Sequence, residues 1–157
     1  MSKPRALIRP ATIADSEPIA PLLAQLGYPT DPEEIPARMR RLAEAPDAGV
    51  FVAEAAGRLV GLAAFQIFEL IYRPRPQCRL TALVVDRDHR RQAVGTALLE
   101  AVERCARERD CFRLELTTRP QRPDALPFYV ALGFAERPHR LVKLLADCPP
   151  RSRGMLD

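Results

Sequence analysis

A basic turn followed by a helix start is the segment of this sequence best suited to chemistry. It reads HRRQAVGT, His89 to Thr96, and follows the apolar run LTALVVD. The first amides of a helix lack partners within the helix and carry partial positive charge, so they can hold a phosphate. Arg90 and Arg91 add charge, and Gly95 lets an oxygen approach the backbone. The segment predicts a phosphate-binding turn, although a plain strand–turn–helix connection, whose glycine serves packing, has the same pattern.

The rest of the residue inventory excludes several classes of enzyme. Serine occurs only at positions 2, 16 and 152, which leaves a serine hydrolase without a plausible nucleophile. Neither GxxxxGK[ST] nor GxGxxG is present. The four cysteines form no CxxC pair and only two histidines accompany them, so no metal is expected. A reactive group that arrives on a cofactor, or a pure binding role, fits this inventory best.

Length and composition predict one soluble domain over residues 6–146, with a disordered tail at 147–157. No apolar run approaches the roughly 20 residues that span a bilayer. The N-terminus lacks a secretory signal, so we expect a cytoplasmic protein without a membrane partner. The net charge of +4 comes from the second half of the chain and would suit a phosphorylated ligand. Nucleic acid is disfavoured as a partner, because aromatic residues are only 6% and no basic helix stands out.

Hydrophobic periodicity and turn residues predict an α/β chain, in the mixed α+β sense, whose central mixed sheet is flanked by helices. The expected order is β-α-α-β-β-β-α-β-α-β-β, with Gly27 and Gly133 ending helices and Asp31 capping one. The predicted strands are 6–12, 49–55, 57–72, 78–86, 111–118, 134–137 and 140–145, and the predicted helices are 12–28, 31–45, 89–110 and 123–134.

Two blocks of the sequence resemble the GNAT superfamily of N-acetyltransferases. RRQAVG is similar to the acetyl-CoA motif [Q/R]xxGx[G/A], with Arg90 first, Gly95 last and Ala93 where the family has glycine. ALPFYVALGF is similar to AxxFYxxLGF, and the opening IRPAT with Asp15 is also usual in the family. The second block matches at Ala125, Phe128, Tyr129, Leu132, Gly133 and Phe134. The resemblance covers roughly residues 6–146 and implies an acyl-CoA N-acyltransferase-like fold.

The resemblance implies an enzyme that transfers an acetyl group from acetyl-CoA to a primary amine, by direct attack in a ternary complex and without a metal. Tyr129 matches the tyrosine that protonates the departing thiolate, since a phenol with a pKa of about 10 stays protonated at neutral pH. A core aromatic is the alternative for this residue. The implied cofactor contacts are Leu83, Val84, Val85, Arg90, Arg91, Gln92, Ala93, Val94, Gly95 and Thr96.

The general base is open between two carboxylates and water. Glu69 alternates with Phe65, Ile67 and Ile71 on one expected strand face, so we expect it to be partly buried. Glu115 is the second candidate, and its alternative role is a salt bridge to a neighbour such as Arg113.

Two departures from the family keep a second function in view, a non-catalytic acyl-CoA-binding sensor or subunit on the same fold. They are Ala93 and Arg122, which stands where the family often has asparagine. The acceptor is open between a small molecule and a protein amine, because the flanking segments 27–35 and 66–78 carry both acidic and basic residues. Dimers are common in the family, so a homodimer is compatible with the resemblance.

Overall fold

The computed structural model describes residues 5–119 and 122–145, in two compact units, Met1–Leu116 and Thr117–Asp157. Each unit is described by itself below. The single domain over 6–146 stays a prediction, and the predicted tail lies outside the described residues.

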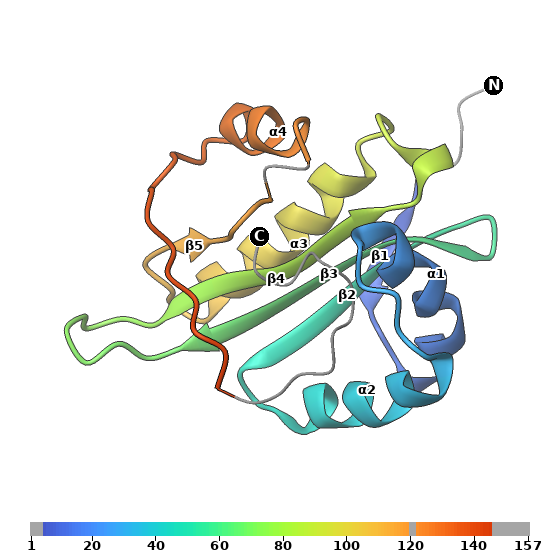
Figure 1. Ribbon diagram of the computed structural model, residues 1–157, viewed down its shortest axis with the longest axis horizontal. Helices are drawn as coiled ribbons and strands as arrows, with labels where there is room; N and C mark the ends of the chain where they lie inside the picture. Colours follow the sequence, from blue (N-terminus) through green and yellow to red (C-terminus); the bar gives the residue numbers. More distant parts are fainter. Residues whose placement is uncertain (1–4, 120–121, 146–157) are drawn as a thin grey trace. The chain divides into compact units, whose positions relative to one another are not determined.

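The first unit contains a five-stranded mixed sheet in the order β1-β2-β3-β4-β5 (Figure 1). Neighbouring strands from β1 to β4 are antiparallel, whereas β5 runs parallel to β4. The strands predicted over 49–55 and 57–72 form a hairpin, and its turn has positive φ at Ala56 (50°) and Gly57 (74°), as tight hairpin turns require. The strands are β1 (Leu7–Pro10), β2 (Ala48–Ala55), β3 (Arg58–Phe68), β4 (Gln77–Val85) and β5 (Leu114–Glu115).

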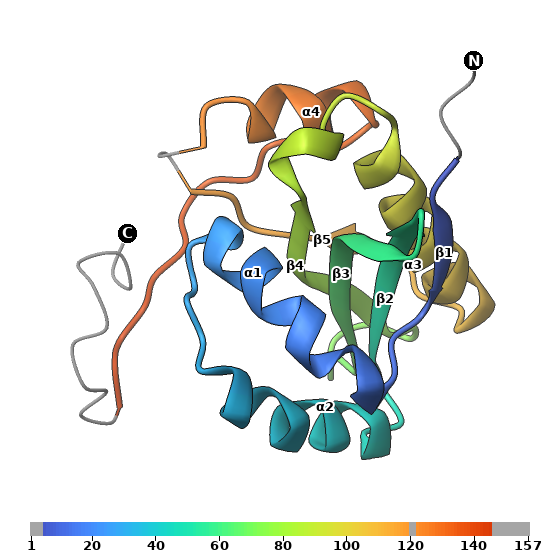
Figure 2. The ribbon, with the colours of Figure 1, turned by 90° about the vertical axis from the view of Figure 1, so that its right-hand side faces the viewer.

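Helices α1 (Ser16–Leu26) and α2 (Ile35–Glu44) cover one face of this sheet, and α3 (Val94–Glu108) covers the other (Figure 2). The core under α1 and α2 consists of buried apolar side chains from both helices and from alternate strand positions. Its members are Ile19, Leu22, Ile35, Met39, Val52, Leu62 and Val84. The face of α3 that is buried against the sheet consists of Val94, Leu98, Leu99, Ala101, Val102 and Ala106.

The predicted stop at Gly27 and cap at Asp31 are confirmed, whereas α1 and α3 begin later than predicted, at Ser16 and Val94. Asp15 accepts a hydrogen bond from the backbone N–H of Thr12 (2.7 Å) and closes the turn η1 (Ile13–Asp15) before α1. Gly27, with φ of 100°, ends α1 in the left-handed conformation that glycine tolerates. Asp31 accepts a hydrogen bond from the N–H of Glu33 (3.0 Å) and caps η2 (Pro32–Glu34), which leads into α2.

The second unit contains α4 (Ala125–Ala131) among its described residues, as predicted, and Gly133 follows its end with φ of 93°. The strands predicted at 134–137 and 140–145 are wrong, since neither segment has regular structure. Strand-forming side chains produce a strand only where a partner supplies hydrogen bonds. The strand predicted over 111–118 is likewise reduced to β5, two residues long.

The fold class is confirmed, a mixed sheet flanked by helices, with the exception of these terminal strands. Within the described ranges, no helix combines the length and apolar character needed to cross a membrane.

Gly61 sets how closely α3 approaches β3, and this can be tested by adding one methyl group. A Cβ at Gly61 would lie 2.9 Å from Leu98 Cδ1 and 3.2 Å from the Val84 carbonyl oxygen. We expect Gly61→Ala to lower the free energy of unfolding by about 1–3 kcal/mol through overpacking, as measured by urea denaturation. Arg58→Ala, at the exposed start of the same strand, is the control and should stay within about 0.5 kcal/mol. Equal effects would show that the contact is not tight.

Candidate donor-binding site

The edge of β4 is unpaired along most of its length on one side. β5 pairs with β4 at Cys78 and Arg79, and from Leu80 to Val85 the described strands pair with β4 only through β3. Unpaired strand edges present N–H and C=O groups that an extended ligand can use like an added strand. The predicted contacts Leu83, Val84 and Val85 all lie on this stretch.

The backbone of β4 also bends at this stretch. Ala64 pairs with Ala82 and Phe65 with Leu80, so Thr81 is an extra residue in the ladder. A β-bulge of this kind twists the strand locally and turns its edge away from a neighbour. The bulge therefore coincides with the point at which β5 stops pairing.

The second part of the site is the start of α3, which residues 86–93 separate from the end of β4. Ala93 precedes the helix and supplies no side-chain cap, and the first intrahelical bond runs from the Ala97 N–H to the Ala93 carbonyl (3.0 Å). The amides of Val94, Gly95 and Thr96 thus have no partner within the helix. The structure brings these predicted amides together at one helix end, with the exposed side chains of residues 90–93 directly before them.

Two residues of this turn adopt a backbone conformation that favours glycine. Arg91 has φ of 58°, and Ala93 has φ of 60° and ψ of 14°. A side chain in the left-handed region costs on the order of 1–2 kcal/mol. The family glycine that Ala93 replaces therefore stands at a position where its conformational freedom matters. The methyl group of Ala93 adds strain there, because its φ is not helical.

Asp86 anchors the beginning of the turn. One carboxylate oxygen accepts from the Asp88 N–H (3.0 Å) and lies 3.1 Å from His89 Nδ1, and the other accepts from Gln25 Nε2 (2.9 Å). The hydrogen bond from Gln25, more than any other contact, lowers the pKa of Asp86 to about 2. Sequence reasoning missed both Asp86 and Gln25, whose pairing joins residues 61 positions apart.

Arg90 also contacts the end of β4. Its Nε donates to the Val85 carbonyl (3.2 Å), while Gln92 Nε2 donates to the Asp88 carbonyl (3.2 Å). These two predicted side chains therefore hold the turn itself in the free protein, rather than extending freely from it.

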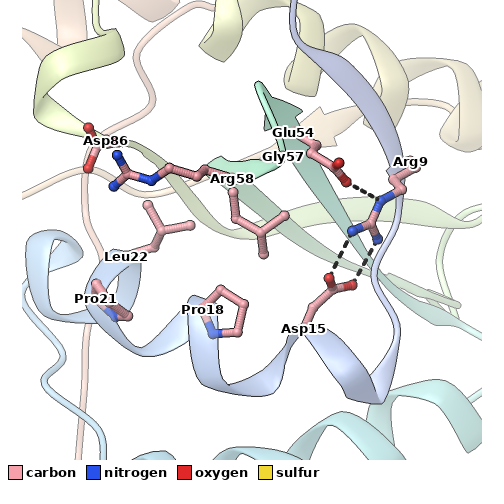
Figure 3. A pocket seen from close by; sticks show the side chains of 10 residues that line it. Arg9, Asp15, Pro18, Pro21, Leu22, Glu54, Gly57, Arg58 and Asp86 are labelled. Carbon is pink, nitrogen blue, oxygen red and sulfur yellow. Dashed lines mark hydrogen bonds and ion pairs between the residues drawn. The ribbon is translucent and has the colours of Figure 1, made fainter.

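A pocket of about 320 Å³ lies between α1 and the β2–β3 turn, with Asp86 at its margin (Figure 3). Arg9 and Arg58 both line it, and Arg9 is paired with Asp15 (2.8 Å) and with Glu54 (3.1 Å). Asp15 is buried, and the hydrogen bonds from Arg9 lower its pKa. These ion pairs join β1, β2 and the start of α1, so Arg9 and its two partners have a structural role here.

The structure places one candidate base in solvent and the other in ion pairs. The expectation for Glu69 is wrong, because β3 ends at Phe68, Glu69 is exposed and Ile71 is fully exposed beyond it. Glu115 forms ion pairs with Arg79 and with Arg113 (3.4 Å), which is the salt-bridge alternative. A base role for either carboxylate stays a prediction.

Tyr129 lies on α4 in the second unit and is buried. Its ring makes edge contacts with Phe128 (5.1 Å between centroids) and Phe134 (5.5 Å). Burial raises the pKa of the phenol, which keeps it protonated at neutral pH, and a nearby Arg122 opposes the shift. The phenol of Tyr129 is thus protonated, as a general acid must be. It also has the aromatic packing that the alternative role, a core aromatic, predicts.

The model of the Acetyltransferase (GNAT) family matches residues 17–134, more than half of the chain. The chain belongs to the GNAT acetyltransferase family. This membership supports acyl transfer from acyl-CoA. No curated protein sequence gives a significant match.

Solved structures resemble this GNAT chain over most of its length. A transcriptional regulator from Bacillus halodurans C-125 is 26% identical with a TM-score of 0.79, covering 88% of this chain and 98% of its own. The aminoglycoside N-acetyltransferase AAC(6')-Iy in complex with CoA has 22% identity, a TM-score of 0.79 and coverage of 94% and 98%. Glucosamine-6-phosphate N-acetyltransferase from Arabidopsis thaliana is 20% identical with a TM-score of 0.79, covering 91% of this chain and 100% of its own. The last two, below 25% identity, support the fold alone.

The strain at Ala93 predicts a stabilising substitution in this GNAT protein. We expect Ala93→Gly to raise the free energy of unfolding by about 1 kcal/mol, because glycine adopts the left-handed conformation without penalty. The same change inside the helix, Ala97→Gly, should lower it by about 1 kcal/mol. Urea denaturation of both variants measures the difference. A loss of stability in both would contradict a left-handed Ala93.

The lowered pKa of Asp86 predicts part of the acid sensitivity of the fold. Its folded pKa of about 2 lies below the ordinary 3.8, so its stabilisation is complete above the ordinary value and is lost as pH falls toward 2. Between those limits the unfolding free energy of the parent should fall more steeply than that of Asp86→Asn. Urea denaturation at a series of pH values measures both slopes. Glu17→Gln, exposed on α1, is the control. If the unfolding free energy of Asp86→Asn fell with pH as steeply as that of the parent, the lowered pKa of Asp86 would be contradicted.

Proposed function

We propose that this protein is an acetyl-CoA-dependent N-acetyltransferase that transfers the acetyl group directly to a primary amine in a ternary complex. The observation that carries the proposal is that the first unit contains two backbone features suited to a donor. From Leu80 to Val85, β3 is the only described strand that pairs with β4, and the amides of α3, which no side chain caps, follow after residues 86–93. Together they suit a ligand that is extended and amide-bearing at one end and carries a diphosphate at the other.

Each element has a part in holding the donor. The edge at Leu83 to Val85 would bond the amides of the pantetheine arm, and the N–H groups of Val94, Gly95 and Thr96 would bond the diphosphate. Arg91, exposed beside these amides, adds positive charge. Acetyl-CoA supplies an activated thioester when bound, and the chain supplies orientation and hydrogen bonds.

The chain contributes two kinds of group to the transfer. A backbone amide near Val85 would stabilise the negative charge that develops on the carbonyl oxygen. The buried phenol of Tyr129 would donate its proton to the departing sulfur, and its raised pKa keeps that proton in place at neutral pH until the thiolate forms. For loss of the ammonium proton we favour water, with Glu69 and Glu115 as the competing candidates.

The acceptor is a primary amine of a small molecule or of a protein. One structural neighbour carries a bisubstrate analogue of an aminoglycoside, so aminoglycosides belong in a first panel of amines. The decisive experiment incubates the protein and acetyl-CoA with such a panel and measures release of free CoA thiol. A blank without amine is needed to subtract the reaction of the protein's own thiols. Cys78 should contribute little to it, because burial raises the pKa of this thiol to about 12 and slows its reaction with thiol reagents. A cytoplasmic location and a homodimer stay predictions.

A non-catalytic acyl-CoA sensor on the same fold is the second candidate. The strained Ala93, in place of the family glycine, favours it, and so does the resemblance to a protein described as a transcriptional regulator. Calorimetric binding of acetyl-CoA without acetylation of any amine in the panel would support the sensor over the enzyme.

Replacing the phenol hydroxyl separates catalysis from binding. We expect Tyr129→Phe to lower kcat about 100-fold, since it removes the proton donor, and to leave the Kd of CoA within about twofold. Steady-state kinetics and calorimetry supply the two measurements. A parental kcat across the pH range would remove Tyr129 from the chemistry.

A further inference from the structure

The turn between β4 and α3, residues 86–93, has a conformation that its own sequence does not favour. It includes left-handed Arg91 and Ala93 and contains no glycine. Strained backbone of this kind persists only where surrounding contacts fix it. The direction of the α3 amides therefore depends on whatever holds this turn.

Gln25, near the end of α1, makes two hydrogen bonds to the first residues of the turn. Its Nε2 donates to Asp86 Oδ2 (2.9 Å), and its Oε1 accepts from the Arg87 N–H (2.9 Å). Both ends of one amide side chain are thus engaged by adjacent residues of the turn. The contacts join segments 61 and 62 residues apart, so they belong to the tertiary structure and not to the local turn.

The helix that carries Gln25 is firmly packed. Ile19 and Leu22 of α1 are each 2% exposed in the core beneath the sheet, and Gln25 itself is half-buried. Moving the backbone of Gln25 would require moving α1 against this core. The packed helix therefore gives the Gln25 side chain a fixed point of attachment.

The position of Asp86 is passed along the turn by a series of hydrogen bonds. Its Oδ1 accepts from the Asp88 N–H (3.0 Å), and its carbonyl accepts from the His89 N–H (2.9 Å). Gln92 Nε2 then donates to the Asp88 carbonyl (3.2 Å). The series reaches from Gln25 to the residue just before the cap of α3.

We propose that Gln25 is a positioning residue for donor binding, which acts through Asp86 and Arg87 to hold the turn that aims the α3 amides. The inference rests on the proposed function for the identity of the ligand. It gives a residue on the opposite face of the sheet from α3 a part in the affinity for CoA. Gln25 itself donates and accepts within the protein, so its effect belongs to binding and not to the chemical step.

Truncation of the side chain tests the proposal. We expect Gln25→Ala to raise the Kd of CoA about tenfold in calorimetry, a change of about 1.4 kcal/mol, which two lost hydrogen bonds can supply. The KM for acetyl-CoA should rise by a similar factor while kcat stays within about twofold. Glu17→Ala, exposed on the same helix, is the control and should leave both unchanged.

Exchanging the hydrogen-bond donor and acceptor between positions 25 and 86 distinguishes the proposal from a purely structural role of α1. Gln25→Glu alone places two carboxylates together and should weaken CoA binding at least as much as the alanine variant. Combined with Asp86→Asn, the donor and acceptor are exchanged and the pair can form again, so the Kd should return to within about threefold of the parent. General loosening of α1 would lower Tm without this recovery.

Three results separate the outcomes. A parental Kd in Gln25→Ala, or no recovery in the double variant, overturns the proposal. A parent protein that binds no CoA makes the proposed function fail instead. In that case amide hydrogen exchange of residues 87–96 is measured in the free protein. We expect these amides to exchange faster in Gln25→Ala than in Glu17→Ala. Equal rates in the two variants would overturn the inference.

Discussion

The early separation of β5 from β4 is the constraint on which the donor site depends. β5 is fixed to the start of β4 by the bond from the Cys78 N–H to the Arg113 carbonyl (3.0 Å) and by the hydrogen bond from Arg113 to buried Gln77 (2.7 Å). Beyond Arg79 this pairing ends, whereas β3 pairs with β4 as far as Val85. One edge of β4 is thus paired along its length, while the other has no described partner strand beyond Arg79 and is the edge proposed for the donor. A longer β5 would fill that edge with protein.

The start of α3 is less stable than a capped helix start would be, and it has hydrogen-bond donors that no side chain caps. A serine or aspartate cap would satisfy an early amide and stabilise the helix by about 1 kcal/mol. Ala93 provides no such cap and adds backbone strain. The missing cap leaves these amides without a side-chain partner at the helix start, and functional sites commonly violate local rules in this way. The turn is held from outside by the side chain of Gln25, which bonds Asp86 and the Arg87 N–H.

The sequence predicts what is locally encoded. The apolar period of α3, the Ala56–Gly57 hairpin and the helix around Tyr129 follow from neighbouring residues, and all are observed. Pairing between distant segments is not encoded in this way. Alternation places Glu69 on a strand face but does not tell where β3 loses its partner, and the segment 140–145 has strand-forming residues without a partner strand. The Gln25–Asp86 bond, across 61 residues, leaves no local signal for the same reason.

The placement of the carboxylates limits how much acid–base work the first unit can do. Glu69 is exposed, and Glu115 is engaged by two arginines. A primary amine with a pKa of about 10 still has roughly 1% free base two pH units lower, so water can supply the reactive form without a dedicated base. Catalysis would then depend on how well the donor is held and how readily sulfur is protonated. On the proposed function, the groups that hold the donor lie in the backbone of β4 and α3, and the hydrogen bonds of Gln25 on α1 would maintain their geometry.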